Sequence, residues 1–129
     1  MAELSTYMED RIVNFMRNTA ITGQAAVYVA LFTADDGLEA GTITSEVSGG
    51  SYARELAGLS VSSDGISSNA GDITFTTASA SWGTITTVAL LDASTGGNVI
   101  MYSVLDASKT VGSGDTFKIN TGDLDVTIA

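Results

Sequence analysis

The apolar residues of this 129-residue chain change their spacing once, near residue 23, from a helical period to the period of a β-strand. Before this point they recur at i, i+4, i+8, i+11 and i+12, which places them on one face of a helix. These residues are Leu4, Met8, Ile12, Phe15 and Met16. We predict one helix over about residues 4–18, capped by a box that pairs Thr6 with Glu9. The rest of the chain is predicted to be extended.

Beyond residue 25 the apolar runs are short and are separated by Gly, Asn, Asp and Ser. The run 25–33 contains no charged residue, which predicts a central strand buried on both faces. The clearest hairpin joins residues 84–92 to residues 98–105 through a glycine-containing loop. Further short strands are predicted at 52–61, 73–75, 115–120 and 123–128.

About seven short strands after one helix are typical of a mainly β fold, and we predict an antiparallel β-sandwich with a single N-terminal α-helix. The expected organisation is one domain over residues 1–129, with the helix at about 4–18 and the sandwich at 25–129. The segment 34–51 is acidic, rich in glycine and too polar for the core, so it is expected to be an exposed loop. Two positions remain open for the helix, either folded back over the sheet or docked on a neighbouring subunit.

The amino-acid composition excludes several classes of function. The chain contains no cysteine and no histidine, which removes disulfides, thiol catalysis and the commonest general base at neutral pH. Its net charge of -10 opposes binding to a nucleic-acid backbone. Its apolar runs are far shorter than the ~18 residues of a membrane span. We therefore predict no catalytic residue, no cofactor, and neither nucleic acid nor membrane as a partner.

Two groups of carboxylates are the candidates for chemistry. They are Asp35, Asp36 and Glu39 in the long loop, and Asp115, Asp123 and Asp125 near the end of the chain. Asp123 and Asp125 share one face of a strand, about 7 Å apart, and oxygen ligands of this kind can hold Ca²⁺. Neither spacing matches an EF-hand loop. We expect ordinary turn and edge carboxylates without a metal, and a calcium-dependent carbohydrate-binding module remains an alternative.

Trp82 and the apolar helix face each have two interpretations. Trp82 is the only tryptophan, and it is either a core aromatic or an interface anchor, since tryptophan is enriched at binding hot spots. The helix face either packs within the chain or docks on another subunit. The interface hypothesis assigns subunit contacts to Leu4, Met8, Ile12, Phe15, Met16 and Trp82, together with the loop 34–51.

Six strings carry a family resemblance that covers nearly the whole chain. They are RNT (17–19), VYVALFT (27–33), EVSGGSYAR (46–54), ASWGT (80–84), GSGD (112–115) and GDLDV (122–126). In this order they resemble a family of small structural proteins encoded by tailed bacteriophages. Members of that family are often labelled tail fibre proteins, and similar small β-rich proteins act as cement on capsids.

The resemblance implies a structural protein of the virion, located on the outer surface of the capsid or on the tail. Our main expectation is a capsid decoration or cement protein, because one compact domain with one appended helix suits repetitive binding across joints between major capsid subunits. The alternative is a tail-fibre or baseplate component, such as a host-receptor adhesin. The expected partners are the major capsid protein, copies of the chain itself as a homo-oligomer, or both.

Overall fold

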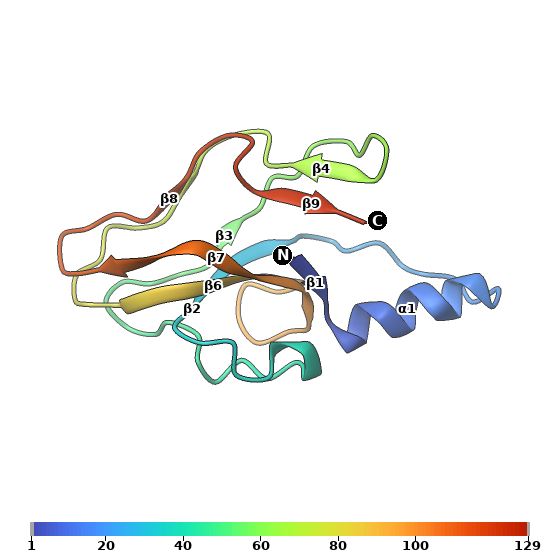
Figure 1. The fold of residues 1–129 in the computed structure, drawn as a ribbon, viewed down its shortest axis with the longest axis horizontal. Helices are drawn as coiled ribbons and strands as arrows, with labels where there is room; N and C mark the ends of the chain where they lie inside the picture. Colours follow the sequence, from blue (N-terminus) through green and yellow to red (C-terminus); the bar gives the residue numbers. More distant parts are fainter. Residues whose placement is uncertain (1, 129) are drawn as a thin grey trace.

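The computed structural model describes residues 2–128, and most of them belong to short strands or to the loops between strands. The elements are β1 (Ala2–Leu4), α1 (Thr6–Met16), β2 (Tyr28–Phe32), the 3₁₀ helix η1 (Leu38–Ala40), β3 (Glu55–Leu56), β4 (Ile66–Ser68), β5 (Ile73–Thr74), β6 (Gly83–Leu91), β7 (Val99–Val111), β8 (Lys118–Ile119) and β9 (Asp125–Thr127). Five strands form one antiparallel sheet in the order β1-β7-β6-β2-β3, and two ribbons pair β4 with β9 and β5 with β8 (Figure 1). The predicted mainly β, sandwich-like fold with one helix is confirmed.

The strand β2 is buried on both faces, as its uncharged sequence predicts. Val29 and Leu31 point into a first core, which lies between the five-stranded sheet and the two ribbons. Ala30 and Phe32 point into a second core on the opposite face of the sheet. All four side chains are fully buried. This arrangement requires a cover on each side of the sheet.

The cover of the second core comes from the segment 34–51, which we expected to be an exposed loop. Leu38, at the start of η1, is fully buried in that core, and Ile43 packs against it. The segment then crosses to the other face, where Val47 joins the first core. These three apolar residues follow neither a helical nor a strand period, so their roles are invisible to periodicity. Most of the polar residues of the segment lie on its outer surface.

The helix α1 is shorter than predicted at both ends. Leu4 lies in β1, where its backbone pairs with that of Met101 in the sheet and is therefore not part of the helix. Ser5 is the N-cap, since its Oγ accepts a hydrogen bond from the backbone N–H of Met8 at 3.3 Å, and the predicted box starting at Thr6 is wrong. The chain leaves the helix where Asn18 takes a left-handed φ of 67°. Within the described residues no helix is long and apolar enough to cross a bilayer.

The hairpin of β6 and β7 is confirmed, whereas other strands are shorter than predicted. Only Glu55–Leu56 forms a strand within 52–61, and Val61 is 95% exposed despite its place in the alternating pattern. The last two strands, β8 and β9, do not pair with each other across their turn. They pair with β5 and β4 instead, which ties the end of the chain to its middle.

Trp82 is part of the first core, with only 4% of its surface exposed. Its ring meets that of Tyr52 edge to face at a centroid distance of 5.4 Å, and its Nε1 donates a hydrogen bond to the carbonyl of Gly50 at 2.9 Å. A Cβ at Gly50 would lie 2.9 Å from Nε1, and the φ of this residue is +56°, so glycine is required there. Of the two interpretations of Trp82, the core aromatic is the one that the structure has, and its ring is not available as a surface anchor.

We predict that Trp82→Ala lowers the free energy of unfolding by about 3–5 kcal/mol, because it opens a cavity between the sheet and the ribbons. Urea unfolding followed by circular dichroism measures this loss. Val61→Ala is the matched control, since that side chain is exposed and its removal should change stability by less than about 0.5 kcal/mol. An equal effect of the two substitutions would contradict the placement of Trp82.

A candidate interface on the projecting N-terminal arm

The helix α1 and the segment that follows it project from the body of the molecule, and we call residues 6–27 the N-terminal arm. Figure 1 shows α1 leaving the sheet beside β1 and pointing away from both layers. Large apolar side chains are exposed near its outer end, namely Val13 (55%), Phe15 (62%), Met16 (79%) and Ile21 (38%). A group of exposed apolar residues on one projecting element is typical of a protein–protein contact surface.

The base of the arm is held firmly by Ser5, which is fully buried. Its backbone N–H donates to the carbonyl of Ile100 at 3.0 Å, and its hydroxyl donates to the carbonyl of Val99. Two residues before Ser5, the carboxylate of Glu3 accepts a hydrogen bond from the hydroxyl of Tyr102 at 2.8 Å. The direction of the arm is therefore set by its hydrogen bonds to β7.

The predicted apolar face of the helix divides between the two interpretations. Leu4 and Met8, near the base, pack against the first core. Ile12 is half-buried, whereas Phe15 and Met16 in the last turn are exposed. Packing within the chain therefore accounts for the first turns, and the outer turn is free for a neighbour. Trp82 lies in the core rather than with these residues.

The outer part of the arm differs in charge from the rest of the molecule. Glu9 and Asp10 lie nearer its base, Arg11 and Arg17 lie farther along it, and no acidic residue occurs between residues 11 and 34. The guanidinium of Arg11 stacks over the ring of Tyr7 and donates to the carbonyl of Thr22, which holds the returning segment against the helix. The outer part of the arm is thus basic and apolar on a chain whose net charge is -10.

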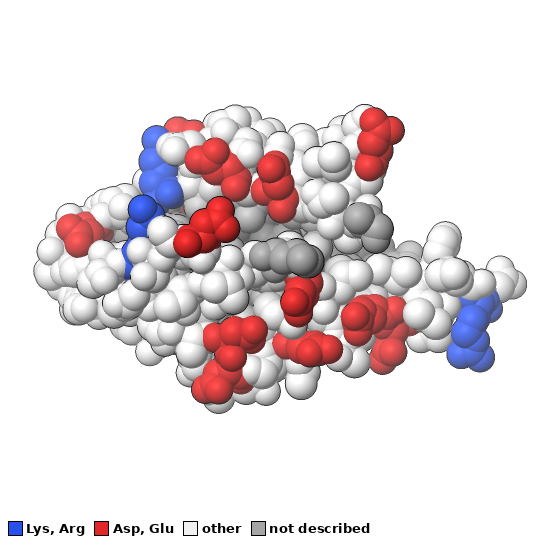
Figure 2. All heavy atoms as spheres, viewed as in Figure 1, with Lys and Arg blue, Asp and Glu red and all other residues white. Residues whose placement is uncertain are grey.

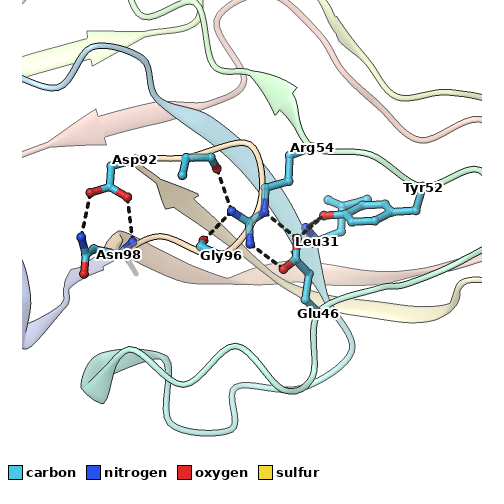
Figure 3. Close-up of polar contacts among 8 residues, drawn as sticks. Leu31, Glu46, Tyr52, Arg54, Asp92, Gly96 and Asn98 are labelled. Atoms are coloured by element: carbon cyan, nitrogen blue, oxygen red, sulfur yellow. Dashed lines mark hydrogen bonds and ion pairs between the residues drawn. The ribbon is translucent and has the colours of Figure 1, made fainter.

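A buried ion pair, which periodicity does not reveal, joins the segment 34–51 to the β6–β7 hairpin (Figure 3). Arg54 Nε and Nη2 each donate to Glu46 at 2.7 Å, and the Arg54 side chain is 2% exposed. Arg54 Nη1 donates to the carbonyls of Ala93 and Gly96 in the hairpin loop, at 2.7 and 2.8 Å. The hydrogen bonds that Arg54 donates to Glu46 raise the pKa of Arg54 above its ordinary value. Only the fold brings these distant residues together.

The cluster of polar side chains around Arg54 and Glu46 stabilises the fold. Glu46 also accepts a hydrogen bond from the hydroxyl of Tyr52 at 3.0 Å, and that hydroxyl accepts one from the backbone N–H of Leu31 at 3.0 Å. Burial, with the nearby Glu46 charge, raises the pKa of Tyr52 well above its usual value. Each polar group is therefore matched by a partner within the chain, as expected for a buried network.

The two carboxylate groups considered from the sequence are not gathered into a metal site. Among residues 2–128, no three acidic side chains lie close enough together to hold an ion. Individual members have local roles, because Asp36 accepts from Ser45 Oγ at 3.3 Å and Asp115 from the N–H of Gly112 at 2.9 Å. Asp123 accepts from Asn120 Nδ2 at 3.2 Å. These are turn carboxylates.

Comparison with known proteins places most of the chain in one family. A family model described as Podophage GP4 fiber I protein gp80 matches residues 3–127. No curated protein matches the chain.

We predict that the double change Phe15→Ser and Met16→Ser leaves the free energy of unfolding within about 0.5 kcal/mol of the original, because both side chains face solvent. The comparison variant is Met8→Ala, which removes a side chain packed on the core and should cost about 2 kcal/mol. Thermal and urea unfolding of both variants measure the difference. A large loss in the double variant would mean that the outer turn is also held by the chain.

The buried tyrosines predict a loss of stability in alkali. Burial and hydrogen bonds to Glu46 and Glu3 raise the pKa of Tyr52 and Tyr102 above the ordinary value of 10.0. The unfolded chain loses these protons near pH 10 while the folded chain keeps them, so stability is complete below about pH 10 and falls as the pH rises further. Urea unfolding at a series of pH values between about 8 and 12 measures this loss. Tyr52→Phe should reduce the slope of stability against pH, and an unchanged slope would contradict this.

Proposed function

The chain belongs to the family of Podophage GP4 fiber I protein gp80, and from this premise we propose that it is a structural subunit of the tail fibre of a podophage. The family is one of fibre proteins, so the chain is a structural protein of a phage particle. This favours the tail-fibre alternative over our main expectation of a capsid decoration protein. The match over residues 3–127 is the observation that carries the proposal, because it includes both the arm and the body.

The arrangement of the arm supports a function in assembly. A subunit of a fibre must present a defined surface to the next component, and that surface must not be buried within the subunit's own fold. The arm meets both conditions, since Ser5 sets its direction and Phe15 and Met16 remain exposed. Exposed apolar side chains of this kind gain stability when a partner covers them.

We propose that the subunit works by contact and without a catalytic centre. The side chains of the ion pair between Arg54 and Glu46 use their hydrogen-bonding groups within the chain. The exposed carboxylates described above bond to neighbouring turns. Neither group offers a nucleophile beside a base, the arrangement that most covalent catalysis requires.

The location of the protein on the particle tests the proposal. Intact virions are labelled with gold-conjugated antibodies against this chain and viewed by electron microscopy. We expect gold at the tail region and a copy number, from quantitative mass spectrometry, of a few to a few dozen per particle. Gold spread over the head with hundreds of copies would instead establish the capsid-decoration alternative, with the major capsid protein as partner.

A control links the location to the arm. Particles that carry Phe15→Ser and Met16→Ser should lose the protein, whereas particles that carry the exposed change Val61→Ser should retain it. Retention in both would show that the arm is not the attachment surface.

A further inference from the structure

A groove of about 530 Å³ lies between the outer part of β7 and the strands β8 and β9. Leu105, Ile119 and Leu124 contribute half-buried apolar surface to it. Among the described residues, the edge strand β1 pairs with β7 from Met101 to Ser103, and the groove lies beside the residues of β7 that follow. Its lining therefore combines apolar and charged side chains and is accessible from solvent.

The charged residues of this groove are mostly acidic. Asp106, Asp123 and Asp125 line it, and Figure 2 shows acidic side chains gathered beside this part of the surface. Lys109 and Lys118 line it as well. Lys118 pairs at 2.9 Å with Asp72, whose pKa its hydrogen bond lowers to about 2, so the Lys118 charge is already matched. The groove keeps a net negative charge.

The outer part of the N-terminal arm has the complementary properties. Arg11 and Arg17 lie beyond the acidic pair Glu9 and Asp10, no further acidic residue occurs before residue 35, and Figure 2 shows basic surface at the end of the arm. The rest of the chain holds all fifteen acidic residues and only three basic ones. Two copies of such a chain repel each other over most of their surfaces. The arm is the region that can approach an acidic groove with both charge and apolar surface in its favour.

We propose that the arm of one copy docks in the groove of a second copy, with Phe15 and Met16 covering the apolar lining and Arg17 facing Asp106 and Asp125. This inference names a partner for the arm and rests on the proposed function, in which the chain is an assembly subunit. The arm does not reach its own groove, because Ser5 fixes its base and it points away from the body (Figure 1).

The proposed contact is heterologous, since it joins two different surfaces of the same chain. Each copy then offers one arm and one groove, and successive copies join head to tail. Such contacts close into a ring when the rotation between copies allows it and otherwise continue as a chain of subunits. Both outcomes suit a component of an elongated appendage.

Sedimentation velocity and native mass spectrometry of the full chain test the contact between about 10 µM and 1 mM, a range in which weak to moderate affinities are visible. We expect species larger than one chain, decreasing as salt screens the charged part of the contact. The arm variant Phe15→Ser with Met16→Ser and the groove variant Asp106→Lys with Asp125→Lys should each be monomeric. The control Asp35→Lys with Glu39→Lys makes the same change in net charge away from the groove and should still associate. Urea unfolding verifies that all variants fold.

A mixing experiment separates this contact from a symmetric one. The arm variant keeps an intact groove and the groove variant keeps an intact arm, so an equal mixture should form a species of two chains and no larger one. Arg17→Asp should weaken association, and adding Asp125→Arg in the same chain should restore part of it. A monomeric original chain over the whole range, or a groove variant that still associates with itself, would overturn the inference.

The result is independent of the location of the protein. Gold on the head together with the two-chain mixture would overturn the fibre proposal and leave this contact standing. Gold on the tail together with a monomeric chain would do the reverse, and the arm would then bind a different component of the particle.

Discussion

The complete burial of β2 on both faces is the constraint on which the rest of the structure depends. A strand with Val29 and Leu31 on one side and Ala30 and Phe32 on the other must be covered on both faces. A face left exposed would lose the stabilising free energy that comes from burying its apolar side chains. The ribbons and Trp82 cover one face, and the 3₁₀ turn around Leu38 covers the other. The pair of Arg54 with Glu46 then ties this second cover to the β6–β7 hairpin, so that a polar loop becomes part of the core architecture.

The same architecture leaves the N-terminal arm outside. Once the two faces of the sheet are covered by other segments, the apolar face of α1 has room against the core only for its first turns. Leu4 and Met8 are packed there, whereas Phe15 and Met16 extend beyond the body. A phage structural protein gains from such a division, because a stable body and an exposed contact element serve different needs. The net charge of -10 opposes contact between copies over most of their surfaces.

Elements with a clear local period were predicted well. The uncharged run around β2, the hairpin of β6 and β7 and the helix itself each carry a pattern that reflects their surroundings. The pattern was misleading at Val61, where alternation continues past the end of the sheet into solvent. It was silent at Leu38, whose burial depends on a turn rather than a period, and at Ser5, whose cap position depends on bonds to Val99 and Ile100 in a distant strand. The family match agrees with a resemblance that the sequence strings already carry.

By itself the sequence determined the class of fold, the identity of the doubly buried strand and the absence of cysteine and histidine chemistry, because these follow from composition and nearest-neighbour spacing. The tertiary structure alone decided that Trp82 is internal, that Arg54 meets Glu46, and that the helix divides into a packed base and a free tip. It also decided that β8 and β9 pair with β5 and β4 across long stretches of chain. The physical reason is the same in each case. These contacts join residues that are far apart in the sequence, and the local spacing of apolar residues does not encode which distant segments pack together.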